Sequence, residues 1–135
     1  MAKTSGVGIT TLSIDDSAGT PRDIRTDINS FDLATPRGVQ DTTGLDVSGM
    51  ERLLLLADAS ISIKGVFDPA ANLAHSVFRT VPSTSVQRTV SFAHAAQTLA
   101  MEMVFSDYAM ARGQNAELTY TAPGALANGA VPTWA

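Results

Sequence analysis

The chain has 135 residues, 44% hydrophobic and 16% charged, with a formal net charge of −4. This length suits one domain with a single core, and the charged share is below the roughly one quarter usual in soluble domains, so part of the surface is expected to be interface. The negative charge argues against a surface that grips nucleic acid through Lys and Arg, and the lack of cysteine excludes disulfides, thiol nucleophiles and thiolate metal sites.

The N-terminal quarter is expected to hold two strands. Residues 1–8 are small and polar, without the apolar core of a signal peptide, and should form a flexible arm. A short strand at 9–14 is followed by a turn-forming cluster at 15–21. Within a second strand at 22–33 the apolar residues change parity, which indicates a bulge or a change of the covered face; they are Ile24 and Ile28, then Phe31 and Leu33.

The next segment, 34–50, carries loop signals but is long for a loop in a compact domain. It also contains too many apolar residues for a simple linker, namely Val39, Leu45, Val47 and Met50. We therefore expect an ordered loop that docks on a partner. A short helix across 48–56 is an alternative, with Ser48 as its cap and Glu51 three residues later.

The stretch from Glu51 to Phe67 contains four consecutive leucines, Leu53, Leu54, Leu55 and Leu56, and then alternates apolar and polar residues. Alternation indicates a strand with one buried and one wetted face. As one strand it would be roughly 50 Å long at about 3.3 Å per residue, against about 5–6 residues in a typical strand. A small domain has little material to cover it, so we expect other copies of the chain to cover the leucines. The alternative is a doubly buried strand within one domain.

The segment 68–81 has the pattern of a helix. Asp68 is a natural N-cap, Pro69 fits the first helical position, and Pro82 ends the segment. Apolar residues at 3–4 spacing form one stripe; they are Leu73, Ala74, Val77, Phe78 and Val81.

Three strands are expected in the C-terminal half. The first two, 86–92 and 99–105, are joined by a link short enough for a hairpin, and the third is 116–122. Residues 123–135 contain two prolines and two glycines, which predicts an extended tail, and no apolar run approaches the roughly 18 residues of a transmembrane helix. The order of elements predicts an α+β domain spanning 1–135, an antiparallel β-sandwich or partial barrel with one flanking helix.

Residues with catalytic chemistry are sparse. His75 and His94 have no second ligand at metal-binding spacing. Asp15 and Asp16 lie in the expected turn, where solvated acids are the rule, and Glu102 and Asp107 fall on opposite parities. No nucleophile elbow or phosphate-binding loop is present. We expect no catalytic site, no metal and no cofactor, and hence no enzyme.

An ordered set of short phrases resembles the major tail tube protein of long-tailed, siphovirus-type bacteriophages. The phrases run through nearly the whole chain: 35–38 (TPRG), 44–46 (GLD), 51–58 (ERLLLLAD), 78–84 (FRTVPST), 107–108 (DY), 117–119 (ELT) and 131–134 (VPTW). The resemblance implies a virion structural protein that forms six-membered rings, which stack into a tube with a continuous β-barrel lumen. Closure of such a barrel removes free strand edges.

The resemblance also implies partners and a location. The chain would bind itself within and between rings, and would meet tape measure, tail terminator and distal tail proteins, in a virion tail assembled in the host cytoplasm. The long loop at 34–50 would reach the adjacent ring. The candidate contact residues are Val39, Leu45, Val47, Met50, Leu53, Leu54, Leu55, Leu56 and Trp134.

Double-stranded DNA would pass through such a tube during ejection without specific binding, and no membrane is involved. The lumen wall should therefore be polar and neutral to acidic, so that it repels phosphates. The candidate lumen residues are Asp27, Asn29, Ser60, Ser62, Lys64, Gln87, Thr89, Ser91, Thr98, Glu102 and Ser106. Lys64 is the exception in charge. Either a neighbour such as Glu102 neutralises it, or this face points outward.

Two other functions remain open at this stage. One is a different ring of the virion, a tail terminator or head–tail connector, which would stop at a single ring. The other is a non-viral β-sandwich module that binds a small molecule or glycan. Such a site would need clustered exposed aromatic residues, and aromatics make up only 6% of the chain.

Overall fold

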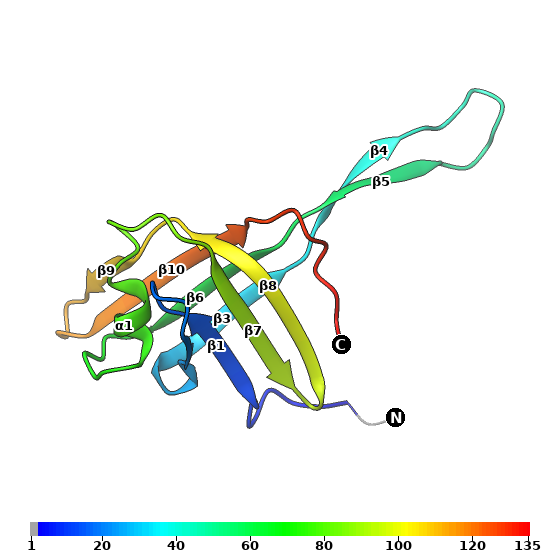
Figure 1. Ribbon diagram of the computed structural model, residues 1–135. Coiled ribbons are helices and arrows are strands. Elements are labelled where there is room, and N and C mark those ends of the chain that lie inside the picture. Colours follow the sequence, from blue (N-terminus) through cyan, green and yellow to red (C-terminus); the bar gives the residue numbers. More distant parts are fainter. Residues whose placement is uncertain (1–2) are drawn as a thin grey trace.

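A computed structural model describes residues 3–135, so the first two residues of the expected flexible arm, 1–8, lie outside the described part. Nearly all regular structure is antiparallel β-sheet (Figure 1). The strands are β1 (Thr11–Asp15), β2 (Pro21–Asp23), β3 (Ile28–Ala34), β4 (Arg37–Asp41), β5 (Arg52–Ala57), β6 (Ser60–Val66), β7 (Arg88–His94), β8 (Gln97–Phe105), β9 (Ala109–Arg112) and β10 (Leu118–Leu126). A 3-10 turn, η1 (Arg25–Asp27), and one helix, α1 (Ala74–Phe78), complete it.

The eight-stranded main sheet has the order β2-β1-β7-β8-β10-β6-β3, with β9 beside β10. It bends at β8, which pairs with β7 along most of its length but with β10 only from Met103 to Phe105. The two halves therefore face each other across one apolar core, and the rings of Phe31 on β3 and Phe92 on β7 lie 5.2 Å apart. This is the predicted α+β architecture, a bent antiparallel sheet intermediate between a sandwich and a partial barrel, with one helix on its flank.

The hairpin predicted between the two central C-terminal strands is present. β7 and β8 pair from Arg88–Met103 to His94–Gln97, and the two connecting residues, Ala95 and Ala96, both have positive φ. Two residues with positive φ make the type of turn whose twist matches that of the strands. The alternation predicted for both strands is also observed, since Val90, Leu99, Met101 and Met103 are buried.

The segment 22–33 is not one strand but three elements, β2, η1 and β3. The parity change was a valid signal of irregularity, because the register between β3 and β6 shifts between Ile28 and Ser30. The turn at η1 carries Asp27 into the core. Gly65 on β6 makes this path possible, since a Cβ there would lie 2.0 Å from the carbonyl oxygen of Asp27.

Two further predictions were wrong in this region. The segment 34–50 is not a loop throughout, because 37–41 forms β4, which pairs with β5. The stretch 51–67 is two strands, β5 and β6, interrupted at Asp58–Ala59. The break lies opposite Pro36, which has no amide hydrogen to donate, and the Asp58 amide donates to the Pro36 carbonyl oxygen at 3.0 Å.

The helix is real but shorter than predicted, Ala74–Phe78 instead of 68–81. Asn72 has a φ of +65°, a left-handed conformation that stops the helix from starting at Pro69. Asp68 is not its N-cap and instead accepts a bond from the Ala70 amide. The Asp27 carboxylate, remote in sequence, accepts a hydrogen bond from the Ala74 amide at 3.0 Å. The predicted stripe does face the core, since Ala74, Val77 and Phe78 are buried.

The last strand extends past its predicted end at Ala122 and runs to Leu126. Proline was expected to end it, but β10 pairs with β9 at 118–121 and with β8 at 124–126 on one side. Pro123 lies between those two pairings, where no ladder donor is needed. The short strand β9 escaped prediction because all four of its residues are exposed and none forms an alternating pattern.

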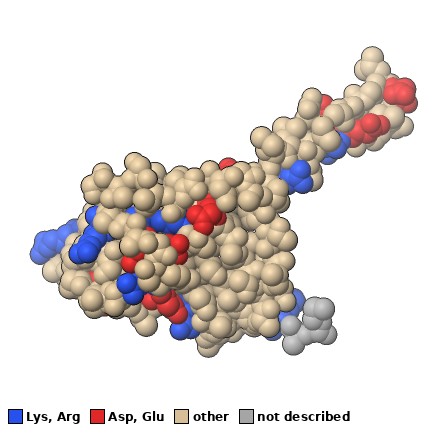
Figure 2. Space-filling view, viewed as in Figure 1, with Lys and Arg blue, Asp and Glu red and all other residues tan. Residues whose placement is uncertain are grey.

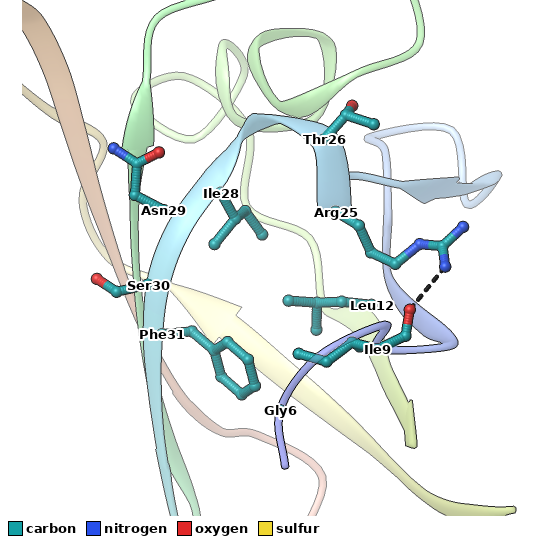
Figure 3. A pocket seen from close by; sticks show the side chains of 9 residues that line it. All are labelled: Gly6, Ile9, Leu12, Arg25, Thr26, Ile28, Asn29, Ser30 and Phe31. Atoms are coloured by element: carbon teal, nitrogen blue, oxygen red, sulfur yellow. Dashed lines mark hydrogen bonds between the residues drawn. The ribbon is translucent and has the colours of Figure 1, made fainter. Parts of the chain in front are cut away.

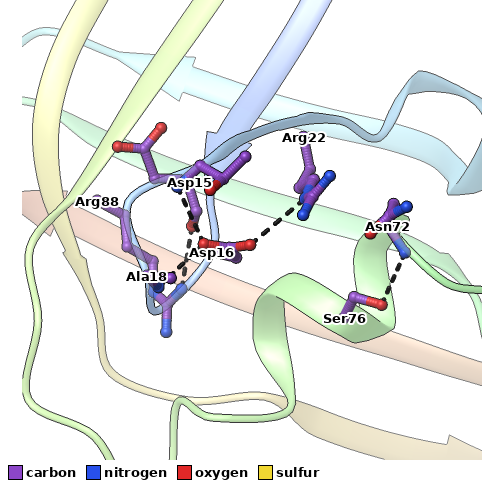
Figure 4. A network of polar contacts seen from close by, with 8 residues as sticks. Asp15, Asp16, Ala18, Arg22, Asn72, Ser76 and Arg88 are labelled. Carbon is purple, nitrogen blue, oxygen red and sulfur yellow. Dashed lines mark hydrogen bonds and ion pairs between the residues drawn. The ribbon is translucent and has the colours of Figure 1, made fainter.

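A buried arginine joins the first turn to the core. Arg88 is 1% exposed and donates to the Asp15 carbonyl oxygen and to the Thr80 hydroxyl. Burial lowers the pKa of Arg88, while the nearby charges of Asp16 and Asp15 oppose that shift. Asp16 in turn pairs with Arg22 and accepts bonds from the amides of the turn (Figure 4), and these bonds lower the pKa of Asp16. The network fixes the β1–β2 turn.

Candidate assembly interface

The hairpin of β4 and β5 projects from the body as an arm, defined here as residues 35–58 (Figure 1). It continues the β3–β6 pair beyond the edge of the core. Within residues 3–135 neither β4 nor β5 pairs with any strand but the other. An isolated two-stranded hairpin is marginally stable in water, so the arm has the form of an element that requires a partner.

The arm carries the largest group of exposed apolar side chains in the described chain. Leu45 at its tip is fully exposed and Leu56 is 90% exposed. All nine predicted contact residues are exposed by more than a third; besides those two they are Val39, Val47, Met50, Leu53, Leu54, Leu55 and Trp134. The alternatives for the leucines are therefore wrong: 53–56 is neither a helix nor a strand buried within its own domain, and this surface is larger than single scattered apolar residues would produce.

Polar contacts hold the arm in shape. Arg37 donates from Nε and Nη2 to the Leu55 carbonyl oxygen at 2.9 and 2.7 Å. Near the tip, the Thr43 hydroxyl donates to the Asp41 carboxylate and accepts a hydrogen bond from the Glu51 amide. These two contacts close the loop. The Thr43 hydroxyl and amide lower the pKa of Asp41. The tip thus carries acids, visible as red at the end of the arm (Figure 2), beside its apolar residues.

The C-terminal tail lies along the free edge of β8. Thr98 and Ala135 exchange two backbone hydrogen bonds, at 2.9 and 2.8 Å, and Trp134 forms a bridge with Leu99. The Trp134 ring packs edge-on against Phe92 with centroids 6.2 Å apart, yet it remains 52% exposed. Trp134 is therefore held in a fixed position with about half of its surface exposed.

The predicted lumen residues do not share one face. Ser60, Ser62 and Lys64 lie on the outer side of β6, opposite Ala34, Asp32 and Ser30 of β3. A second group lies on the outer sides of β7 and β8: Thr89, Ser91, Thr98 and Glu102. Because the two halves of the sheet face each other across the core, their outer sides point away from each other. Asn29, Gln87 and Ser106 are exposed near the strand ends.

One of the lumen predictions is wrong. Asp27 is 7% exposed, and its carboxylate points at the start of α1. Burial raises the pKa of Asp27 above its usual value, partly offset by the Ala74 amide and reinforced by the charge of Asp68. The prediction assumed a regular strand through 22–33, in which Asp27 and Asn29 would lie on the same face. The 3-10 turn η1 interrupts that strand and directs the Asp27 side chain into the core.

The outer side of β7 and β8 is partly covered by the chain itself, whereas the outer side of β3, β6 and β10 is not. Glu102 bonds the Thr89 hydroxyl, and the Ala127 amide donates to the Glu102 carbonyl oxygen as the tail passes this side. The outer side of β3, β6 and β10 is more open, with Ser60 and Lys64 exposed. β10 separates Lys64 from Glu102, so Glu102 does not neutralise Lys64, and within residues 3–135 Lys64 forms no ion pair.

The described residues hold little that suggests chemistry. Among residues 3–135 no three His, Asp or Glu side chains gather as a metal site. His75 bonds the Tyr108 hydroxyl at 3.1 Å within an aromatic cluster, and burial raises the pKa of Tyr108 and Tyr120. No helix in this part of the chain has the length and apolar character needed to cross a membrane.

Comparison with known proteins identifies the fold. No family model matches the chain, and no curated protein sequence matches it. Among solved structures, it is similar to a chain in the tail of an empty gene transfer agent particle with C6 symmetry. That chain is 19% identical, with a TM-score of 0.72, 98% of this chain covered and 99% of the other. A chain in the virion of a native gene transfer agent particle is 20% identical, with a TM-score of 0.70 and coverage of 98% and 99%. The chain therefore shares the fold of these particle subunits over 98% of its length.

Proposed function

We propose that this chain is the structural subunit of a tail tube, which forms rings of six that stack into a hollow tube. The observation that carries the proposal is the end-to-end match to a subunit of a C6-symmetric tail, at a TM-score of 0.72. The arm supports it independently, because this apolar projection has no partner among residues 3–135 of its own subunit. Six copies related by a six-fold axis would each give and receive the same contacts.

The edges of the sheet suit assembly into a ring. β3 ends one side of the main sheet and pairs only with β6 among the described strands, while β9 lies beside β10 with its other edge open. Unpaired edges are liabilities in a monomer, and closure into a barrel removes them. Pairing between neighbouring subunits in a ring would satisfy both edges with one type of contact.

The outer side of β3, β6 and β10 is the better candidate for the lumen wall. It carries hydroxyls, Asp32 and the single cation Lys64, and the tail does not cover it. A wall of this kind offers DNA phosphates few cations to pair with. The β7–β8 group would then face outward, so Thr89, Ser91, Thr98 and Glu102 would not line the channel.

The same proposal assigns no enzymatic activity, and DNA passes through without specific recognition. Further partners would be the proteins that set the length of the tube and close its ends, a tape measure, a terminator and a distal tail protein. Assembly would take place in the host cytoplasm, and the mature location would be the virion tail.

Negative-stain electron microscopy of the purified chain over a range of concentrations tests the proposal. Rings and tubes of uniform bore are the expected result, with six-fold symmetry in end views. A compact monomer at every concentration would contradict it. Rings that never stack would favour a terminator or connector instead.

A further inference from the structure

We propose that the C-terminal tail, residues 127–135, closes the free edge of β8, so that no strand of another copy pairs there, and that it stays in place after assembly. The inference concerns the edge of the free subunit and does not require the proposed tube. Three features of the described residues carry it. They are the edge itself, the way in which the tail satisfies its own backbone groups, and the contrast with the edges that stay open.

The strands of the sheet leave most of one edge of β8 uncovered. β7 pairs with one side of β8 along 97–103, whereas β10 pairs with the other side only along 103–105. The backbone of Thr98 bonds the tail on that second side. Because the direction of the backbone groups alternates along a strand, those of Ala100 and Glu102 point to the same side. An uncovered row of such groups is a template for a strand of another chain.

The tail is fixed to this edge at two points. At its end, Ala135 exchanges two backbone hydrogen bonds with Thr98, at 2.9 and 2.8 Å, next to the bridge that Trp134 forms. At its start, the Ala127 amide donates to the Glu102 carbonyl oxygen at 3.0 Å. The two points lie at opposite ends of the uncovered row, so a foreign strand would have to displace the tail in order to pair along it.

Between these points the tail does not present a new edge. A regular strand would only move the open edge outward, but the tail uses up or lacks the groups that a further strand would bind. The Ala130 amide donates to Oδ1 of Asn128 at 3.0 Å. The Thr133 hydroxyl donates to the Val131 carbonyl oxygen at 3.3 Å, and Pro132 has no amide hydrogen. A gap of about 180 Å³ lies between this part of the tail and β8. The tail therefore ends the sheet instead of extending it.

The edge of β3, by contrast, stays open. Among the described strands β3 pairs only with β6, and an opening of about 480 Å³ separates its first half from β1 and the segment before β1. Figure 3 shows this opening, with Ile28 and Phe31 on one side and Ile9 and Leu12 on the other. The tail thus closes one edge and leaves others, those of β3 and β9, for pairing between copies.

Removal of the tail tests the proposal in the free subunit. The test variant ends after Ala127, and sedimentation compares it with the full chain at equal concentrations. The shortened chain should leave the monomeric state at a concentration at least about fivefold lower, the factor that one net hydrogen bond supplies. In the associated product, the amides of Thr98 and Ala100 should exchange hydrogen more slowly than in the shortened monomer. An equal onset in both chains, or association without slower exchange at these amides, would overturn the proposal.

A single substitution decides the matter if the shortened chain does not fold. Ala135→Pro removes the amide hydrogen that bonds Thr98 but keeps the length of the chain. Ala135→Gly is the matched control, because it keeps that amide. Only the proline variant should associate at a lower concentration than the unmodified chain. The same onset in both variants would show that the pairing of the tail with β8 does not protect the edge.

A reversible lock tests whether the tail stays in place in the assembly. The chain has no cysteine of its own, and residues that exchange two backbone bonds have Cα atoms about 5.5 Å apart, within disulfide range. Thr98→Cys with Ala135→Cys should form tubes at the same yield when oxidised and when reduced. Tubes that form only after reduction would show that the tail must open, and would overturn the proposal. If the unmodified chain forms neither rings nor tubes, the proposed function fails, whereas the comparison of monomers still tests the edge.

Discussion

Large apolar residues are buried in the body of this subunit but exposed in its arm. In the body, Leu12, Leu99 and Met103 are at most 2% exposed and hold two halves of a bent sheet together. In the arm, four consecutive leucines are 42–90% exposed and hold nothing together within the subunit. Burial of apolar area stabilises at about 25 cal/mol per Å² wherever it occurs. The body gains this stabilisation on folding, whereas the arm would gain it only in the proposed assembly, when another copy covers it.

The largest expected effect is a loss of stability when an apolar side chain is removed from the body but not when one is removed from the arm. Phe78→Ala removes a fully buried ring that packs against Phe105 at 5.2 Å between centroids, and should lower the free energy of unfolding by about 3–5 kcal/mol. Leu54→Ala, in the exposed arm, should change it by no more than about 0.5 kcal/mol. Chemical denaturation of monomers measures both. Similar losses in the two variants would mean that the arm packs on the body.

The second expected effect is on assembly. Leu45→Asp with Val47→Asp places charges on an apolar tip that we expect to be buried between rings, so tubes should be lost. The unfolding midpoint of the monomer should be unchanged, because both positions are exposed. Electron microscopy and sedimentation measure the tubes. The conservative control, Leu45→Met with Val47→Ile, should retain them, and tubes at normal yield in the charged variant would contradict the role of the tip.

A smaller effect is expected in the body where the backbone at Asp27 lies close against Gly65. Gly65→Ala introduces a Cβ that would meet the Asp27 carbonyl oxygen and the Tyr120 hydroxyl, and should destabilise the monomer by about 1–3 kcal/mol. Gly49→Ala, in the arm, meets nothing within 4 Å and should have no such effect. Thermal unfolding of the two variants compares a close-packed region with an open one through the same substitution.

The smallest expected effect is pH-dependent and confined to the body. Because burial raises the pKa of Asp27 above 3.8, the native state binds a proton in a pH window where the unfolded state has lost it. Stability therefore increases as the pH falls through that window. Asp27→Asn keeps an oxygen for the Ala74 amide and removes the buried charge, so it should raise the unfolding midpoint at pH 7.

The gain from Asp27→Asn should shrink as the pH is lowered toward 4, because the native aspartate then becomes neutral as well. Thermal unfolding at several pH values measures this. Asp32→Asn, on the exposed outer side of β3, is the matched control and should not alter the midpoint. A gain for Asp27→Asn that is equal at all pH values would mean that packing, not charge, is responsible.

Sequence reasoning was most successful where one periodicity ran without interruption. The hairpin of β7 and β8 follows from alternation. The exposed apolar strip at 53–56 follows instead from composition, because four consecutive leucines fit no alternating pattern. It failed where remote residues decide local structure. The start of α1 is fixed by Asp27, 47 residues away in the chain, and the continuation of β10 through Pro123 depends on a change of neighbour from β9 to β8. Neither dependence can be read from nearby residues.

The same limit applies to the predicted surfaces. All nine contact residues are exposed, because an apolar residue without a place in an alternating pattern is a local signal. The lumen residues were chosen by parity, and parity places a residue on a face of its own strand without saying which way that face points. Because the sheet bends at β8, the polar residues of β6 and those of β7 and β8 lie on opposite sides of the body. Only the strand pairing shows this bend.

The exposed leucines of the arm also impose conditions on the subunit before it assembles. Short apolar strands with open edges are the segments most prone to aggregation, and natural sequences flank them with charged residues. Here Glu51 and Arg52 precede the leucines and Asp58 follows them. Such flanks slow indiscriminate association but leave the strip available to a shaped receptor. Growth should therefore show a lag phase and a threshold concentration, since a subunit that joins an existing ring contacts several copies at once, whereas two free subunits make only one contact.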